Sequence, residues 1–328
     1  MENPVLYASA RDRLALPIVD VRHPAFKLRL TELELDALAE KYVNEAAGRQ
    51  QQMTPELVEA LKRSMLGRGL MAASNGFLGG IETYMMKAGP ENLGLDVHPL
   101  DRAIAASFPA LTTRLRMQET AELVADGLSE PLTARPGCPI VFLNIGGGAG
   151  ADSWNAVMLL LSSRPALLIG REVLIVVLDV DEAGPAFGAA AIEALRQPGA
   201  PFESVAVRFQ YATYDWSSPT SLGPILAALP AEAVCAVSSE GALFEYGSDQ
   251  EIVGNLRELR AATPPAVMAA GTVTRDSAAT RASRSSTRVA TVPRSTEAFG
   301  ELAEAAGWVV ESAVARPFSY NVRLFPRQ

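Results

Sequence analysis

Apolar residues recur three and four positions apart through most of the first 130 residues of the chain. This spacing predicts amphipathic helices, because it places the apolar side chains on one helical face. Thr54 followed by Pro55 supports one helix start, since threonine caps helix ends and proline favours the first helical position. We expect helices and no strand in this region; the helices are 31–49, 54–72, 76–89, 100–108 and 116–128.

The pattern changes at residues 131–139, where prolines and a glycine interrupt the helical spacing. Continuous apolar runs follow, alternating with helical segments, and this predicts a parallel sheet covered by helices on both faces. We divide the chain into a mainly helical region, residues 1–135, and an α/β domain, residues 136–328. The expected strands are 140–145, 173–180, 204–212, 233–240 and 266–273, with the clearest helices at 187–197 and 249–262.

The last part of the chain departs from this alternation. After an expected helix at 295–307, the extended stretches 308–315 and 319–326 are separated by a short break, which predicts a terminal antiparallel hairpin. The preceding stretch 275–288 is rich in Arg, Ser and Thr, and we expect a loop there. That loop is either a solvated excursion or a segment that closes over a site at the carboxyl edge of the sheet.

Composition and charge narrow the function classes. The 328 residues are 48% hydrophobic and 20% charged, which is typical of a globular protein with a large core. A formal net charge of −8 disfavours nucleic acid as a partner, because phosphate binding needs a basic surface. No apolar run approaches the length of a membrane span, and no basic leader precedes an apolar stretch at the start. We therefore expect a cytoplasmic protein without a membrane partner.

Cysteine and histidine are scarce. Cys138 and Cys235 lie in or beside apolar runs, so neither a disulfide framework nor a cysteine metal site is expected. His23 and His98 are accompanied by no HExxH or EF-hand pattern, and no GxxxxGK[ST] run occurs. The sequence therefore predicts no metal site and no P-loop nucleotide hydrolysis.

A glycine-rich turn is the strongest motif. The run NIGGGAGAD, residues 144–152, follows a buried strand and precedes a helical segment, and its glycines permit backbone angles closed to other residues. Asp179 ends the next strand, where a carboxylate can accept hydrogen bonds from both hydroxyls of a ribose. Asp181 is either a second ligand contact or an N-cap of the following helix.

These features and the terminal hairpin resemble the class I S-adenosylmethionine-dependent methyltransferases over residues 138–326. The resemblance implies a Rossmann-like, doubly wound, seven-stranded α/β sheet, S-adenosyl-L-methionine as cofactor, and methyl transfer to a small molecule. Classical nicotinamide-binding domains usually show GxGxxG and a sixth parallel strand instead. An NAD(P)-dependent oxidoreductase stays open as an alternative, as does a methyltransferase-like protein that binds the cofactor without methyl transfer.

The same resemblance implies where the cofactor would lie. The turn would follow its methionine part, Asp179 would hold its ribose, and the end of the third strand would lie near its adenine. There Asp215 either bonds the adenine or forms a turn. The expected cofactor-binding residues are Asn144, Gly146, Gly147, Gly148, Gly150, Asp179, Ala212, Thr213, Asp215 and Ser239.

Two features depart from the family pattern. Asn144 stands where many members have Asp or Glu, and an amide cannot supply the same charge to the ammonium group of the cofactor. The interval of 29 residues from Gly150 to Asp179 is longer than usual, which implies an extended helix or an insertion.

The segment after the fourth strand, residues 238–256, carries the candidate catalytic side chains Glu240 and Tyr246. Together with Asp215 and Trp216 it resembles leucine carboxyl methyltransferase-like enzymes. Glu240 could orient the substrate, contact the cofactor, act as a base, or cap a helix. Tyr246 serves either catalysis or packing.

Apart from Met1, the helical region holds six of the nine methionines, which suit an adaptable apolar surface. It either caps the substrate site, packs as ordinary helices, or forms the interface of a homodimer. The first candidates for a substrate wall are Phe77, Tyr84 and Met85; the six methionines are Met53, Met65, Met71, Met85, Met86 and Met117.

Overall fold

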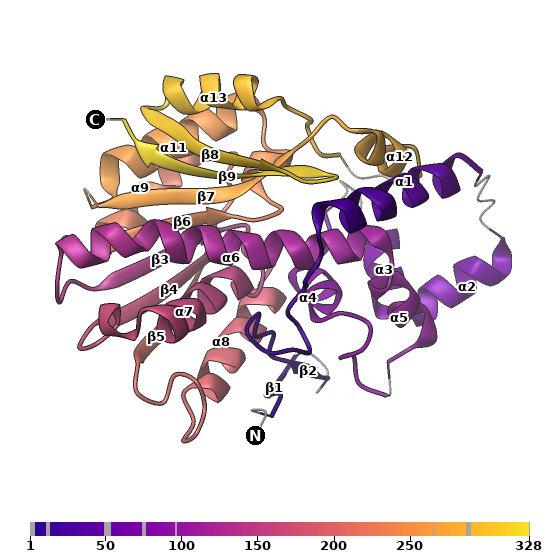
Figure 1. The fold of residues 1–328 in the computed structure, drawn as a ribbon, viewed down its shortest axis with the longest axis horizontal. Helices are drawn as coiled ribbons and strands as arrows, with labels where there is room; N and C mark the ends of the chain where they lie inside the picture. Colours follow the sequence, from indigo (N-terminus) through magenta and orange to yellow (C-terminus); the bar gives the residue numbers. More distant parts are fainter. Residues whose placement is uncertain are drawn as a thin grey trace.

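A computed structural model describes residues 4–10, 14–48, 54–73, 77–95, 97–264, 266–286 and 290–327. Its centre is a seven-stranded sheet of order β5-β4-β3-β6-β7-β9-β8 (Figure 1). The strands are β3 (Ile140–Ile145), β4 (Glu172–Asp179), β5 (Ala206–Thr213), β6 (Val234–Ser239), β7 (Val267–Thr274), β8 (Trp308–Ala315) and β9 (Ser319–Pro326). This is the sheet that the sequence predicted.

The first five of these strands are parallel, whereas β9 inserts between β7 and β8 and runs antiparallel to both. The chain moves outward from β3 through β4 to β5 and then returns to place β6 on the other side of β3. At such a reversal the carboxyl ends of the two central strands open a crevice. The fold therefore places a site beyond the ends of β3 and β6, and the expected terminal hairpin is confirmed.

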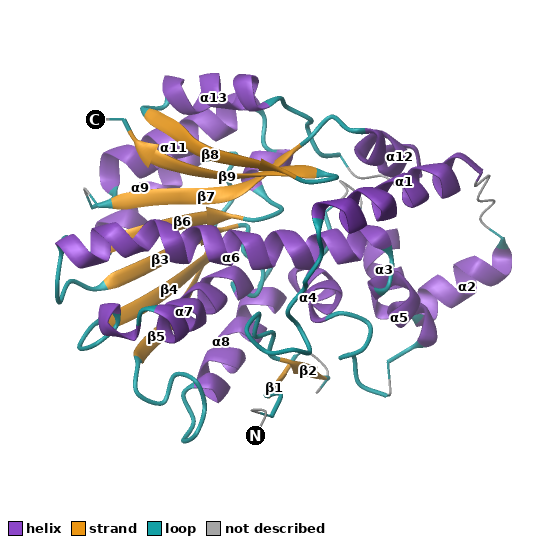
Figure 2. Ribbon diagram, viewed as in Figure 1, coloured by secondary structure: helices purple, strands orange, loops and turns teal. Residues whose placement is uncertain are grey.

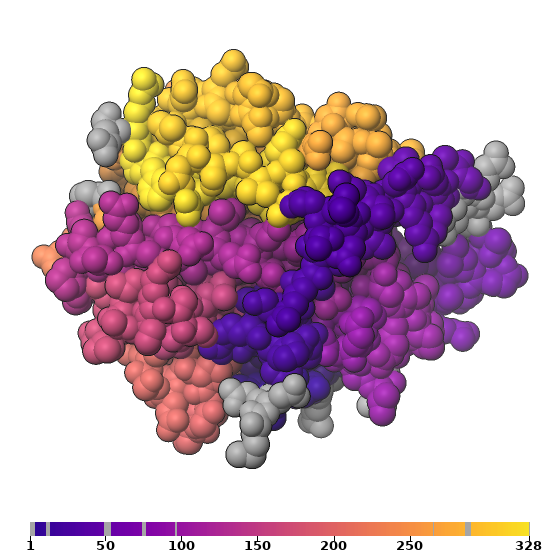
Figure 3. Space-filling view, viewed as in Figure 1, coloured from indigo at the N-terminus to yellow at the C-terminus, as the bar shows by residue number. Residues whose placement is uncertain are grey.

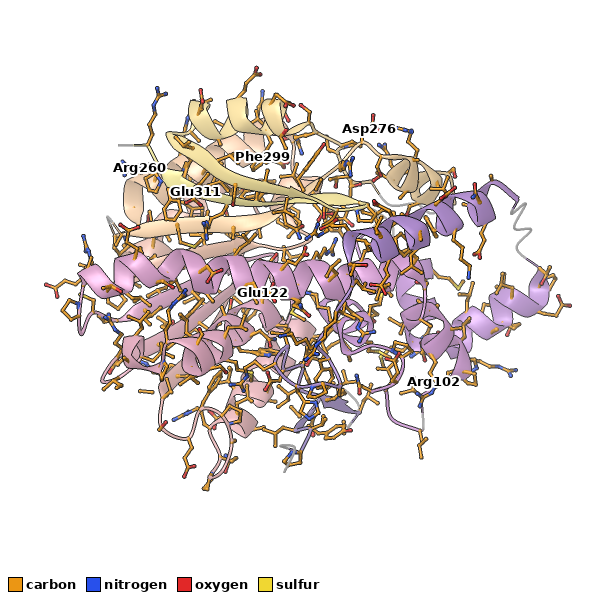
Figure 4. All side chains as sticks on the ribbon, in the orientation of Figure 1. Arg102, Glu122, Arg260, Asp276, Phe299 and Glu311 are labelled. Atoms are coloured by element: carbon orange, nitrogen blue, oxygen red, sulfur yellow. The ribbon has the colours of Figure 1, made fainter. Side chains whose placement is uncertain are left out.

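Helices cover both faces of the sheet (Figure 2). Because side chains alternate along a strand, Phe142 of β3 joins one apolar core and its neighbour Leu143 joins the other. On the second face, Phe299 packs against Phe244 with ring centroids 5.1 Å apart (Figure 4). The first face is covered by α6 (Phe108–Ala134), α7 (Ala151–Ser163) and α8 (Ala183–Leu195), and the second by α9 (Leu222–Ala227), α11 (Asp249–Ala262) and α13 (Thr296–Ala305).

The long helix α6 joins the helical region to the sheet. It has 27 residues, roughly 40 Å at 1.5 Å per residue, and packs against α7, β6, β7 and β9. The sequence predicted only its middle, 116–128. α6 packs directly on the sheet. The boundary between residues 135 and 136 therefore marks a change in the sequence pattern, and the helical region and the α/β domain pack on each other across it.

The remaining helices of the amino-terminal region gather beyond the carboxyl edge of the sheet (Figure 1). They are α1 (Glu32–Gly48), α2 (Pro55–Arg63), α3 (Met65–Ala72), α4 (Gly80–Ala88) and α5 (Pro99–Ala105). The expected helix 54–72 is divided at Ser64, whose side chain caps α3 and donates a hydrogen bond to Asp101. Met53 and the expected start of a helix at residue 76 lie outside the described residues.

Two expectations about secondary structure were wrong. The amino-terminal region contains a small antiparallel pair, β1 (Tyr7–Ser9) and β2 (Ala15–Pro17), although no strand was expected. Three residues are too few to show a strand period. The expected loop at 275–288 contains α12 (Ala278–Ser286), which packs against α1; residues 287 and 288 lie outside the described residues. Burial of Ala279 and Thr280 on α1 stabilises a helix whose composition is otherwise polar.

The amino-terminal segment is bonded to α4 and α7. The Trp154 indole donates to Val19 O at 2.9 Å, and the Tyr84 hydroxyl donates to Pro17 O at 2.7 Å. Figure 3 shows this segment, in indigo, as a band across the magenta part of the surface. It ends at α1, whose Glu32 pairs with Arg316 of the hairpin turn at 2.8 Å. An ion pair therefore joins the start of α1 to the terminal hairpin.

Candidate functional site

The glycine-rich turn connects β3 to α7 at the carboxyl edge of the sheet. Gly146, Gly148 and Gly150 have φ of 64°, 53° and 74°, angles that side chains rarely permit. The turn is anchored to β4, since Gly146 N donates to Leu178 O at 2.7 Å. The expected conformation of the motif is therefore present.

Neighbouring residues of the protein pack closely against this turn. A Cβ atom added to Gly146 would lie 2.5 Å from Cβ of Ala242 and 2.9 Å from Trp216. One added to Gly147 would lie 2.1 Å from Oδ1 of Asn144. Gly80, at the start of α4, packs on Gly148 and would bring a Cβ within 3.1 Å of its Cα. Close packing, as well as backbone angle, thus demands glycine here.

Asp179 ties the turn to the end of β4. Its Oδ2 accepts from Gly148 N at 2.8 Å and its Oδ1 accepts from Asp181 N at 2.9 Å. Burial raises the pKa of this carboxyl, while the hydrogen bonds from both backbone amides oppose the rise. Asp179 is half-buried, so the carboxylate remains partly open to solvent.

Asp181 bonds two helix starts. Its Oδ1 accepts from Ala183 N at 3.1 Å at the beginning of α8, and its Oδ2 accepts from Gly80 N at 2.9 Å at the beginning of α4. Asp181 therefore bonds backbone amides at two helix starts, although the N-cap positions themselves are held by Glu182 for α8 and Gly79 for α4.

Apolar and polar side chains lie exposed along the ends of β4 and β5. Val180 is 66% exposed and Phe77 42% exposed. Phe77 lies 4.2 Å from the ring of Tyr246 and 5.6 Å from that of Trp216, measured between centroids. Ala212 is half-buried, while Thr213 and Asp215 are exposed.

Asp215 has the contacts of a turn-forming residue. Its Oδ1 accepts from Ser217 N at 2.9 Å. The exposed carboxylate retains free acceptor capacity, because an ionised carboxylate can accept about four hydrogen bonds.

Glu240 lies at the centre of a buried group of charges beyond the end of β6. Both Lys87 of α4 and Arg116 of α6 pair with it, and Arg116 also reaches Glu245 Oε1 at 3.2 Å. Burial opposes ionisation of Glu240, but Lys87 and Arg116 outweigh it and hold its pKa below the ordinary value. Glu245 differs: burial raises its pKa in spite of Arg116.

Tyr84 and Met85, two of the expected substrate residues, are packed in the core apart from this group, whereas Ser239 and Tyr246 adjoin it. Tyr84 and Met85 are each 1% exposed, and the Tyr84 ring packs on Phe187 with centroids 4.5 Å apart. Ser239 is buried, and its Oγ has no hydrogen-bond partner in the part of the chain that the structure describes. Burial, followed by the Glu245 charge, raises the pKa of Tyr246 to about 12.

Lys87, Arg116, Glu245 and Asp152 were not singled out from the sequence. Lys87 and Arg116 belong to no motif, and Lys87 pairs with Glu240, 153 positions away. Asp152 ends the glycine-rich run and Glu245 lies in the segment 238–256, but neither side chain was assigned a role. The one available signal was a lysine inside the otherwise apolar end of α4.

Comparison with known proteins supports the fold. No protein-family model matches the chain, and no curated protein matches its sequence. The structure is similar to a possible exported protein from Bordetella parapertussis, with 17% identity and a TM-score of 0.57; the match covers 91% of this chain and 97% of that chain. At this identity the likeness concerns the fold alone.

Two further similarities have lower scores. A DUF574 family protein from Streptomyces avermitilis matches with 19% identity and a TM-score of 0.47, covering 72% of this chain and 93% of that chain. Magnesium protoporphyrin IX methyltransferase from Synechocystis, with bound S-adenosylhomocysteine, matches with 13% identity and a TM-score of 0.43, covering 68% and 89%. Both scores are below 0.5, so the functional argument rests on the site.

Within the described ranges, no helix is both long and apolar enough to cross a membrane. The cytoplasmic location stays a prediction.

Proposed function

We propose that this protein is an S-adenosylmethionine-dependent methyltransferase that acts on a small molecule. The observation that carries the proposal is the bond between Gly148 N and Asp179 Oδ2, at 2.8 Å. It joins a glycine-rich turn to a strand-end carboxylate at the reversal point of a doubly wound sheet, where ligands bind in such folds.

The nucleoside end of the cofactor fits the exposed part of the site. Asp179 uses two of about four acceptor positions, so ribose hydroxyls can still donate to it. Val180, Trp216 and Phe77 offer apolar and aromatic surface beside it, which suits adenine. Thr213 and Ala212 would meet the base through their backbone, and Asp215 through its carboxylate.

The amino-acid end fits the turn. Gly147 has no side chain, and Asn144 Oδ1 lies close to the position that its Cβ would take. That oxygen is buried without a hydrogen-bond partner among the described residues. A buried acceptor without a partner costs about 1–3 kcal/mol, so a donor such as an ammonium group suits it.

The cofactor, when bound, supplies a methyl group already activated on a sulfonium. The protein then needs to align the acceptor and exclude water. Phe77 and Tyr246 would wall the site from solvent. Glu240, held ionised by Lys87 and Arg116, is a weak base, so we assign it to orientation of these groups. With its raised pKa, Tyr246 stays protonated and acts as a donor.

The terminal hairpin separates this proposal from a nicotinamide-dependent oxidoreductase. β9 runs antiparallel between β7 and β8, where a classical dinucleotide-binding sheet has a sixth parallel strand. The class of acceptor is proposed only as a small molecule, since a net charge of −8 disfavours nucleic acid. Formation of a homodimer stays a prediction.

Calorimetry with S-adenosylhomocysteine, NADH and NADPH tests the proposal. We expect binding of S-adenosylhomocysteine and none of the nicotinamide cofactors. Labelled S-adenosylmethionine added to a small-molecule extract should then transfer label to a product. Binding without transfer would favour a cofactor-binding protein without methyltransferase activity, and nicotinamide binding would overturn the proposal.

A further inference from the structure

Five ionisable side chains meet beyond the carboxyl ends of β3 and β6, and their charges do not balance. Glu240 pairs with Lys87 and Arg116, and Arg116 also pairs with Glu245. The fifth, Asp152 in the first turn of α7, forms no ion pair with any residue that the structure describes. With all five ionised, three carboxylates face two cations.

Asp152 also has an unused hydrogen-bond acceptor. Its side chain is 2% exposed, and its Oδ1 accepts from Asn144 Nδ2. Its Oδ2 and the Oδ1 of Asn144 are both buried and make no hydrogen bond of ordinary geometry among the described residues, although the Ser238 hydroxyl lies close enough to Asp152 to lower its pKa. Asn144 therefore carries a buried acceptor with no donor, which is unusual in a folded protein.

These acceptors lie against the glycine-rich turn. Asn144 Oδ1 is close to the position where Gly147 would carry its Cβ. Asp152 is bonded to the same asparagine. A donor that lay along the turn would thus meet Asn144 Oδ1 beside the bonded Asp152 carboxylate.

We propose that Asp152 and Asn144 together hold the ammonium group of the amino-acid tail of the cofactor, with Asp152 supplying the negative charge that Asn144 lacks. This inference rests on the proposed function. It explains how the chain functions with an amide at the end of β3, because the carboxylate comes from the first turn of α7 instead.

The neighbouring groups support an organic cation at this point. In the described ranges, no group of three or more His, Cys, Asp or Glu side chains is arranged to hold a metal ion. Burial raises the pKa of Asp152, and Lys87 is the main group that opposes the rise. The cluster thus has too little positive charge to keep Asp152 at its ordinary acidity, and a bound ammonium group supplies more.

A pair of ligands isolates the ammonium group. S-adenosylhomocysteine carries the amino-acid tail, whereas 5′-deoxy-5′-methylthioadenosine has the same nucleoside and thioether without it. For Asp152→Asn, we expect Kd for S-adenosylhomocysteine to rise at least about tenfold, as for loss of a charge-assisted hydrogen bond. Kd for methylthioadenosine should stay within about twofold.

The control is Asp276→Asn, because Asp276 lies near α12 on the outer side of the molecule, with its side chain 66% exposed (Figure 4). It should change neither Kd. Far-ultraviolet circular dichroism and thermal unfolding establish that both variants fold. If Asp152→Asn fails to fold, Asp152→Ser provides a second neutral side chain for the same comparison.

The outcomes separate the inference from the function on which it rests. Equal weakening of both ligands would show that Asp152 only supports the turn, and unchanged binding of both would remove it from the site; either result overturns the inference. Absence of binding of both ligands to the unmodified protein would contradict the proposed function itself.

Discussion

The single carboxylate of Asp179 has to bond both the glycine-rich turn and the ligand. It accepts from two backbone amides, and the proposed function adds the ribose hydroxyls. For Asp179→Ala we expect S-adenosylhomocysteine to bind more weakly by about 1.5–3 kcal/mol, the range for hydrogen bonds to a charged group. Calorimetry measures the affinity, and circular dichroism shows whether the fold is kept. Unchanged affinity in a folded variant would remove Asp179 from the site.

Asp181→Ala should behave differently, because both oxygens of Asp181 bond helix starts. We expect a loss of about 0.5–2 kcal/mol in the free energy of unfolding, as for removal of an N-cap. The affinity of the folded variant for S-adenosylhomocysteine should change less than about threefold, or 0.7 kcal/mol. Urea denaturation and calorimetry give the two values. A larger loss of affinity than in Asp179→Ala would show that Asp181 is the ribose carboxylate.

Ionisation of the buried Asp152 should lower the free energy of unfolding as pH rises. Burial raises its pKa above the ordinary 3.8, so the folded protein keeps a proton that the unfolded chain has lost. The stability that this group contributes is therefore present at low pH and is lost as pH rises through the raised pKa. Asn cannot ionise, so the stability of Asp152→Asn relative to the unmodified protein should increase from about pH 4 upward and then level off. A difference independent of pH in urea denaturation would contradict this.

Sequence reasoning found the residues whose backbone requirements are local. Gly146, Gly148 and Gly150 follow a strand, and Asp179 ends the next one, so position alone identified them. Lys87, by contrast, meets Glu240 only because α4 docks over the sheet edge. The periodicity of apolar residues does not predict contacts between helices and loops that lie far apart in the sequence. For the same reason Tyr84 could not be recognised as a core residue bonded to the amino-terminal segment.

At the scale of elements, α4 rests on the glycine-rich turn through backbone contact. A Cβ on Gly80 would lie 2.8 Å from Gly184 Cα and 3.1 Å from Gly148 Cα. Gly80→Ala should therefore cost about 1–3 kcal/mol of stability, the range for overpacking, although alanine favours helices. Urea denaturation measures the loss.

Gly300→Ala is the matched control, since Gly300 lies inside α13 with no atom within 4 Å of an added Cβ. It should raise stability by up to about 1 kcal/mol through helix propensity. Stabilisation by both substitutions would show that α4 does not pack closely on the turn.

The strands were predicted better than the amino-terminal helices. Each buried strand is a continuous apolar run, and this pattern does not depend on which helices cover the strand. The break at Ser64 depends on a hydrogen bond to Asp101, 37 positions away, which a helical period cannot show. α12 likewise forms where α1 covers it.

At the scale of the whole molecule, the amino-terminal segment belongs to the core. Leu16, Ile18, Val19, Val21 and Phe26 are all at most 4% exposed and join the core of the first face. Burial of each contributes about 1.5–3 kcal/mol, so together they rival the 5–15 kcal/mol that stabilises a typical protein. We expect deletion of residues 1–28 to abolish folding, seen as loss of near-ultraviolet circular dichroism. The full chain should unfold in one calorimetric transition, and a folded deletion variant would contradict this.

The position of α4 has a consequence for the timing of ligand exchange. Its first residue, Gly80, is bonded to Asp181, and its eighth, Lys87, is paired with Glu240. A helix of nine residues moves as a stiff body, so exposing the whole turn breaks both attachments in one event. Ligand entry then waits for this event, and the observed association rate should reach a plateau as ligand concentration increases. Stopped-flow fluorescence of Trp216, beside the turn, would record that plateau and the opening rate it measures.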